Sequence, residues 1–148
     1  EMTIPMTTKG MILDQMVLIF TRKGCHVYAC NAFLNHVHIL VEIPSPTDFA
    51  KIINKVKSST GVVYRKYPEY ADFSGWAAGF DSFSVSFNDL NRVKHHIEKQ
   101  ETVHQELSFE DEYDQLLEEN GFNAYQDFMR ASFSAYAAVN NHIKNKWK

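Results

Sequence analysis

The spacing of hydrophobic residues changes along the first third of the chain, and each spacing predicts a different element. Apolar residues at positions 12, 16, 19 and 20 share one helical face, which indicates a helix that ends near Lys23 and Gly24. Residues 25–33 and 36–43 are rich in β-branched and aromatic side chains, and Pro44 ends the second run. A turn at Leu34 and Asn35 separates the two runs, so we expect an antiparallel hairpin.

The rest of the chain predicts three further helices and one further strand. A helix begins after Ser45 and carries an apolar stripe from position 49 to position 63. Alternating residues 82–86 predict a strand, and apolar residues at 90, 93 and 97 predict a helix that continues to His104. Residues 109–119 form another helical pattern, followed by a tail with apolar residues up to Trp147. The element boundaries are Pro46, Tyr67, Pro68, Asn88 or Asp89, Asn120 and Gly121.

The order of these elements, α-β-β-α-β-α, predicts the α+β class. We expect a sandwich in which helices lie on one face of an antiparallel sheet. No internal repeat and no long linker interrupts the chain. Residues 1–148 are therefore interpreted as a single domain with a helical C-terminal extension from about residue 105.

Charge is distributed unevenly along the chain. The net charge is −3, but residues 101–119 contain eight acidic residues and no Lys or Arg. Conversely, no acidic residue lies between Asp48 and Glu69, where five basic residues gather. A local basic surface is sufficient for phosphate contacts, although a solvated helix face is the alternative interpretation. The five basic residues are Lys51, Lys55, Lys57, Arg65 and Lys66.

Cysteine usage and hydropathy predict a cytoplasmic protein. Cys25 and Cys30 match no zinc-site spacing, and their position on one strand prevents them from pairing with each other. The sequence also has no signal peptide and no apolar run of about eighteen residues. Because the chain begins at Glu1, we expect a further segment upstream of it.

Two groups of histidines are candidates for a metal site. His36 and His38 are two positions apart on a predicted strand, so both side chains project to the same face. On the predicted helix, His96, Gln100 and His104 follow one another at intervals of four and share a face. Either group alone is equally well explained by ordinary packing or by a polar surface. Together they form a metal-site hypothesis.

Several motifs in order along the chain resemble one family. They are the His-Val-His triplet at 36–38, Gly75 and Trp76, Gly79 and Phe80, the run 83–86 and the helix end at 97–100. This order resembles the insertion-sequence-200-like transposases, the small single-tyrosine members of the HUH superfamily, over roughly residues 24–122. The resemblance implies a ferredoxin-like core whose first strand is not recognisable in residues 1–8. It also implies a homodimer that binds single-stranded DNA hairpins and cuts and rejoins strands during transposition.

The resemblance assigns roles to individual residues. His36, His38 and Gln100 would ligate a divalent metal, Mg²⁺ or Mn²⁺, and mixed nitrogen and oxygen ligands suit Mn²⁺ better. Trp76 is a candidate for stacking on unpaired bases, together with the basic residues named above as phosphate contacts.

Position 96 departs from the family pattern. The family places its tyrosine nucleophile four residues before the glutamine, and this chain has His96 there. His96 is therefore the candidate catalytic residue, either as a histidine nucleophile or as a further metal ligand. The alternative is a catalytically inactive, domesticated DNA-binding protein of the same fold. A ligand-binding or oxidoreductase role finds no glycine-rich or cofactor motif.

Overall fold

The computed structural model describes residues 4–45, 48–71, 73 and 75–121. These residues belong to two compact units. One unit contains the described residues of the ranges 1–76 and 86–101, and the other contains those of the ranges 77–85 and 102–148. We describe each unit by itself, and the interpretation of the whole chain as a single domain stays a prediction. The predicted apolar tail up to Trp147 lies outside the described residues.

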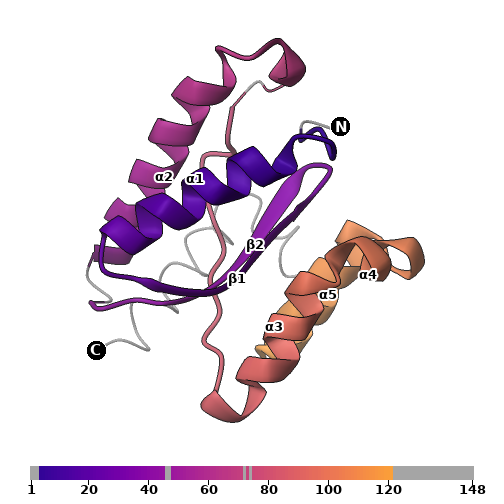
Figure 1. The fold of residues 1–148 in the computed structure, drawn as a ribbon. Coiled ribbons are helices and arrows are strands. Elements are labelled where there is room, and N and C mark those ends of the chain that lie inside the picture. The colour runs from indigo at the N-terminus through magenta and orange to yellow at the C-terminus, as the bar shows by residue number, and fades with distance from the viewer. Residues whose placement is uncertain (1–3, 46–47, 72, 74, 122–148) are drawn as a thin grey trace. The chain divides into compact units, whose positions relative to one another are not determined.

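The first unit is built on the hairpin that the sequence predicts (Figure 1). Strand β1 (His26–Phe33) pairs antiparallel with strand β2 (His36–Glu42). The register places Asn31 opposite His38 and leaves a two-residue turn between the strands. Since side chains alternate along each strand, this register decides which residues reach each face of the hairpin.

The turn contains a non-glycine residue with a left-handed backbone. Leu34 has φ +47°, a region that bulky side chains rarely adopt. Its carbonyl oxygen accepts a hydrogen bond of 2.7 Å from the backbone N–H of Ile4, whose side chain is buried. The N-terminal segment thus helps to hold this turn.

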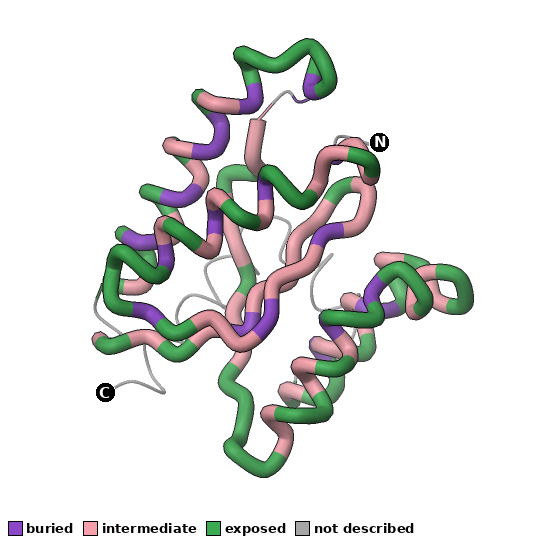
Figure 2. The backbone as a smooth tube through the Cα atoms, viewed as in Figure 1, coloured by how far each residue is buried: buried purple, intermediate pink, exposed green. Residues whose placement is uncertain are grey.

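Two helices cover one face of the hairpin and enclose the main apolar core. Helix α1 (Lys9–Arg22) ends at Lys23, and Gly24 follows with φ +79°, as the sequence predicts. Helix α2 (Phe49–Tyr64) packs beside α1 and is followed by the short 3₁₀-helix η2 (Pro68–Tyr70). Buried positions recur at helical intervals along both helices (Figure 2). The core side chains include Ile12, Met16, Phe20, Ile52, Val56 and Tyr64.

A third helix packs on the opposite face of the hairpin. The 3₁₀-helix η3 (Phe87–Asp89) leads into α3 (Leu90–Glu98), and Ile97 of α3 contacts Ala29 and Leu40 of the strands. The sequence predicted that helices lie on one face of the sheet. This prediction holds for α1 and α2, whereas α3 packs on the opposite face. Alternation explains this layer, because every second strand side chain faces away from α1 and α2.

The prediction of one continuous helix up to His104 is wrong. The helix ends at Glu98, Lys99 adopts a turn, and α4 (Gln100–Glu106) begins at the next residue. The carbonyl groups of the last α3 turn bond to a side chain of β1 instead of continuing the helix, as described below. Sequence spacing alone does not reveal this competing partner.

The predicted strand at residues 82–86 is also wrong. The described backbone between Ala77 and Ser86 carries no helix or strand. Alternation of Phe83 and Val85 with serines favours an extended backbone, but a strand also needs a hydrogen-bonded neighbour. Among the described residues, β1 and β2 pair only with each other.

The second unit contains a helix where the sequence predicts one. Helix α5 (Phe109–Glu119) begins at Ser108, whose hydroxyl accepts a hydrogen bond of 3.1 Å from the N–H of Asp111. It ends at Asn120, followed by Gly121 with φ +82°. The protein is therefore of the predicted α+β class with an antiparallel sheet. None of the described helices has the length and apolar character that crossing a membrane requires.

Candidate metal centre and nucleic-acid interface

The hairpin brings the two strand histidines together on the face that α3 covers. His36 and His38 alternate with residues of the main core and lie on the same side as Leu40. Their ring centroids are 5.1 Å apart and the ring planes are inclined by 75°. Both residues are half-buried. The two imidazoles are thus neighbours on this face, and their convergence on one cation stays a prediction.

Gln100 reaches the same place from the start of α4. Its side chain is fully buried, and its Nε2 lies 2.6 Å from Nε2 of His36. The other His36 nitrogen, Nδ1, lies 2.9 Å from Oδ1 of Asn35. In the tautomer that carries its proton on Nδ1, the His36 ring donates this hydrogen bond to Asn35. That tautomer leaves Nε2 unprotonated, which is the form of imidazole that binds metals.

The oxygen of Gln100 is a buried acceptor that lacks a donor. Its Oε1 has no hydrogen-bond partner among the described residues. Burying such a group costs roughly 1–3 kcal/mol. Rotation of the amide by a half-turn exchanges the two atoms and directs the oxygen toward His36. An unprotonated imidazole, a second imidazole and an unsatisfied amide oxygen are a suitable donor set for a divalent cation.

His96 lies on α3, immediately before the buried Ile97, and is half-buried. The turn at Lys99 separates it from Gln100, so the two residues are not on one continuous helix. The one-turn geometry predicted for His96 relative to Gln100 therefore does not follow from helical spacing. His96 as the catalytic residue stays a prediction.

In the second unit, His104 takes part in a buried pair. Its Nε2 lies 3.2 Å from Oε2 of Glu112, and each side chain is only 3% exposed. Its Nδ1 lies 3.0 Å from the carbonyl oxygen of Leu107. These two contacts hold the His104 ring in one orientation between α4 and Glu112. Glu112, one of the eight acidic residues in 101–119, thus links α5 to His104 of α4.

Tyr113 is held by contacts within the second unit. Its hydroxyl donates a hydrogen bond of 3.3 Å to Oδ2 of Asp81, and its ring stacks on Phe109. Burial, reinforced by the negative charge of Asp81, raises the pKa of Tyr113 to about 12. These contacts indicate a packing role for this phenol.

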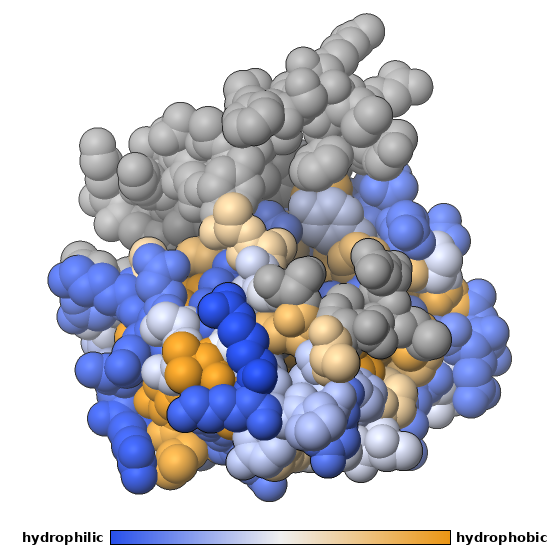
Figure 3. Space-filling model, turned by 90° about the horizontal axis from the view of Figure 1, so that it is seen from above, coloured by the Kyte–Doolittle hydropathy of each residue, from blue (hydrophilic) through white to orange (hydrophobic). Residues whose placement is uncertain are grey.

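The predicted phosphate-contacting residues lie on α2 or just after it. Lys51, Lys55, Arg65 and Lys66 are exposed, and Lys57 is half-buried. Lys51 also forms an exposed ion pair of 3.0 Å with Asp48. On the face drawn in Figure 3, blue hydrophilic side chains surround smaller orange hydrophobic groups. The exposure of the basic side chains leaves them accessible, and their contact with phosphate stays a prediction.

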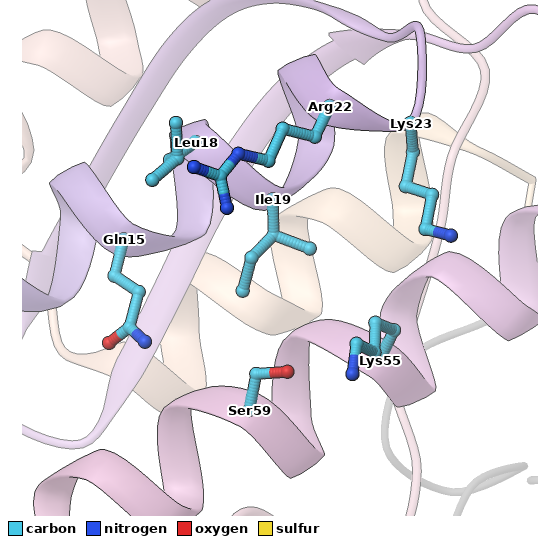
Figure 4. Close-up of a pocket in the computed structure, with 7 residues that line it drawn as sticks. All are labelled: Gln15, Leu18, Ile19, Arg22, Lys23, Lys55 and Ser59. Carbon is cyan, nitrogen blue, oxygen red and sulfur yellow. The ribbon is translucent and has the colours of Figure 1, made fainter.

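Lys55 also lines a pocket of about 340 Å³ between α1 and α2. Two more basic residues, Arg22 and Lys23 at the end of α1, line it together with Ser59 and Ile19 (Figure 4). Sequence reasoning missed this pair, although two adjacent basic residues at a helix end were a visible signal. We call this pocket the basic groove.

Trp76 packs inside the first unit. Its Nε1 donates a hydrogen bond of 2.8 Å to Oγ1 of the buried Thr60. Its ring lies 5.3 Å from the ring of Phe73 and 6.0 Å from that of Tyr64. These contacts indicate a packing role, and the predicted base stacking by Trp76 stays a prediction.

The fold and these side chains define a small α+β protein with a candidate metal centre and a basic groove. A family model described as "Transposase IS200 like" matches residues 7–100, more than half of the chain. The chain therefore belongs to the IS200-like transposase family. Comparisons with curated proteins and with solved structures gave no match. Membership in the family supports a transposase-like function with DNA as the partner, and the family generally uses a divalent metal.

Proposed function

We propose that this protein binds hairpin-bearing single-stranded DNA and, with Mg²⁺ or Mn²⁺ held by His36, His38 and Gln100, cuts and rejoins it. The observation that carries the proposal is the contact of 2.6 Å between Nε2 of Gln100 and Nε2 of His36. The oxygen of Gln100 has no hydrogen-bond donor, and a bound cation would satisfy it. Family membership supplies the DNA partner.

Each residue of the proposed centre has a distinct role. When bound, the metal would stabilise charge that develops on a scissile phosphate. Asn35 fixes the His36 tautomer through Nδ1, so that Nε2 faces the cation site. His38 adds the second imidazole, and Gln100 adds the oxygen. His96 takes the nucleophile position, where its imidazole would attack the phosphorus and displace the 3′-hydroxyl of the preceding nucleotide.

The DNA backbone would follow basic residues of α1 and α2. Arg22, Lys23 and Lys55 line the basic groove, and the exposed Arg65 and Lys66 extend the charge beyond the end of α2. Phosphate contacts of this kind weaken as salt concentration rises. We therefore expect hairpin single strands to bind more tightly than blunt duplex, with affinity falling at high salt.

A homodimer and a cytoplasmic location complete the proposal. Within the described residues the sheet has two strands, so β1 and β2 each leave one edge without a strand neighbour. Such an edge is a ready surface for pairing with a second copy. Sedimentation equilibrium should give twice the chain mass, and a monomer at micromolar concentration would contradict the dimer.

The direct test is formation of a covalent protein–DNA adduct. A labelled DNA hairpin with a single-stranded flank is incubated with the protein and Mn²⁺, and the products are separated on a denaturing gel. We expect a metal-dependent, acid-labile phosphohistidine adduct that His96→Ala and Gln100→Leu abolish. The matched control is His95→Ala, which removes an exposed neighbouring imidazole of the same helix and should keep the adduct.

A second candidate function is DNA binding without cleavage, and His96 is the observation that favours it. In that case the wild type binds the hairpin but forms no adduct. His96→Tyr then separates two explanations, because it places the phenol of the family at position 96 and keeps the proposed metal ligands. An adduct formed only by His96→Tyr would identify a domesticated binder that has lost just its nucleophile. If neither protein forms an adduct while both bind DNA, the cleavage proposal is refuted.

A further inference from the structure

A side chain of β1 holds the end of α3 next to the candidate metal centre. Asn31 donates from Nδ2 to the carbonyl oxygen of Ile97 at 2.9 Å and to that of Glu98 at 3.4 Å. These two carbonyl groups belong to the last turn of the helix, where no further helical N–H is available. Asn31 thereby stabilises the end of the helix two residues before Gln100.

A lysine of α1 completes the same network. Lys9 Nζ donates to Oδ1 of Asn31 at 3.1 Å and forms an ion pair with Glu101, the residue after Gln100. The Lys9 side chain is only 18% exposed, so this pair is more sheltered than the surface ion pairs of α2 and α3. The positive charge also lies near the C-terminal end of α3, where the helix dipole favours a cation.

The hydrogen bonds fix the orientation of the Asn31 amide. The two helix carbonyls require the donor nitrogen on one side. The Lys9 ammonium and the backbone N–H of Ala32, at 2.9 Å, require the acceptor oxygen on the other. Asn31 is thus a single rigid link between α1, β1 and α3. The network holds the backbone on both sides of Gln100, at Glu98 and at Glu101.

From this geometry we infer that Asn31 and Lys9 are positioning residues that hold the Gln100 side chain against His36 and thereby set the affinity of the site for a divalent cation. The inference rests on the proposed metal site, but its geometric part concerns the protein without metal. Asn31 contacts the carbonyl groups of Ile97 and Glu98, and Lys9 contacts the side chain of Glu101, so both act on Gln100 through residues 97–101.

The first measurement is made on the metal-free protein. The Gln100 side-chain amide donates to a ring nitrogen in a fully buried position, so its protons should exchange slowly with water. Asn31→Asp retains an acceptor for Lys9 but loses both donors to the α3 carbonyls. We expect this variant, and Lys9→Met independently, to accelerate exchange of the Gln100 amide in NMR spectra and to shift the ¹⁵N resonance of His36 Nε2.

The second measurement is the dissociation constant of Mn²⁺, followed by the EPR signal of the free ion. Residues that orient metal ligands typically change metal affinity by about 10–100-fold when they are altered. We expect Asn31→Asp to weaken Mn²⁺ binding on the order of tenfold, within that range. In a Gln100→Leu background the same change should have no further effect, because its route to the metal is already removed.

Two control variants remove the same chemical groups outside the network. Asn54→Asp changes an exposed asparagine of α2, and Lys94→Met removes a lysine of α3 that lies 3.9 Å from Glu98 in a surface pair. Both should leave the Gln100 amide and the Mn²⁺ affinity unchanged. A merely structural role for Asn31 would instead lower the melting temperature while leaving Gln100 exchange and Mn²⁺ affinity as in the wild type.

The outcomes separate this inference from the proposed function. If wild-type protein binds no Mn²⁺, the proposed metal site is refuted, and the amide exchange still decides whether Asn31 and Lys9 position Gln100. If the exchange of Gln100 is unaffected by both Asn31→Asp and Lys9→Met, the inference is overturned. Equal effects of Asn31→Asp in wild-type and Gln100→Leu backgrounds overturn it as well.

Discussion

The two faces of the β1–β2 hairpin are made of different kinds of contact. The face under α1 and α2 packs apolar side chains to near-complete burial, with Ile12 at 0% and Phe20 at 1% exposure. The face under α3 has a smaller apolar cluster around Ile97, beside half-buried imidazoles and a buried amide. One sheet therefore carries a closed core on one side and an incompletely satisfied polar cluster on the other.

The difference shows that the residues that stabilise the fold and the residues of the candidate site lie on opposite faces of one hairpin. Burial of apolar area on the α1 and α2 face supplies the free energy that folding requires. That surplus allows Gln100 to keep an oxygen without a donor on the α3 face, although such an atom opposes folding. Substitutions on the two faces should therefore have opposite consequences for stability and for ligand binding.

The largest effect is expected from Phe20→Ala in the closed core. Truncation of a fully buried phenylalanine leaves a cavity and costs roughly 3–5 kcal/mol of unfolding free energy. Urea denaturation followed by circular dichroism measures this loss. Met11→Ala on the exposed side of α1 is the control, with an expected change within about 0.5 kcal/mol. A cost below about 1 kcal/mol for Phe20→Ala would contradict the assignment of this face as the main core.

Gln100→Leu should produce the opposite pattern. It removes a buried amide with an unsatisfied oxygen and retains the volume, so we expect unfolding free energy to change by less than about 1 kcal/mol. Mn²⁺ affinity, in contrast, should fall by about two orders of magnitude, equivalent to about 2.7 kcal/mol. Titration calorimetry measures the affinity and urea denaturation the stability. Strong destabilisation with unchanged Mn²⁺ binding would show that Gln100 is a structural residue.

The basic groove allows a test of DNA binding without disturbing either face of the sheet. Replacing both Arg22 and Lys55 with glutamine removes two charges that line the groove. If each contacts one phosphate of single-stranded DNA, the slope of log affinity against log salt should fall by about 1.4 in magnitude. Fluorescence anisotropy at several salt concentrations gives the slope. Replacement of Lys94 with glutamine is the control, and an unchanged slope in the groove variant would place the DNA elsewhere.

The smallest expected effect is a loss of unfolding free energy at alkaline pH. Burial raises the pKa of the Cys30 thiol from 9.0 to about 12, and it also raises the pKa of Tyr64. The Cys30 thiol ionises at a lower pH in the unfolded chain than in the folded protein. Its effect on the unfolding free energy is therefore absent below pH 9, and stability is lost as the pH rises from 9 to about 12. We expect unfolding free energy to fall by on the order of 1 kcal/mol between pH 8 and 10.

Cys30→Ala isolates the contribution of the thiol. Urea denaturation of this variant should show a smaller loss between pH 8 and 10 than the wild type. The loss that remains belongs to other groups, such as Tyr64. Identical pH profiles for both proteins would show that Cys30 has an ordinary pKa in the native state.

Much of this arrangement could be predicted from the sequence because it depends on local spacing. Alternation placed His36 and His38 on one face, and the apolar stripe of α2 gave its position. The strand predicted at residues 82–86 failed because a strand depends on a hydrogen-bonded neighbour, which local alternation does not report. The turn at Lys99 was missed for a similar reason. Asn31, which bonds to the carbonyl oxygen of Ile97 at this turn, is 66 positions away in the sequence.

Other features of the site could also not be predicted from the spacing of residues along the chain. The link from Lys9 to Asn31 and Glu101 joins three distant segments, and no motif marks its members. The unsatisfied oxygen of Gln100 is a property of packing and not of residue type. The sequence therefore predicted candidate ligands, whereas the structure was needed to find the contacts around them.

The two-residue turn of the hairpin limits how this protein can change length during evolution. Leu34 and Asn35 are the only residues between the paired Phe33 and His36. An insertion or deletion of a single residue that shifts the β2 register by one would turn both histidines toward the apolar core. A shift by two would restore the facing but move His36 by one pleat relative to Gln100. Descendants that keep the site are thus expected to vary the composition of this turn but not its length.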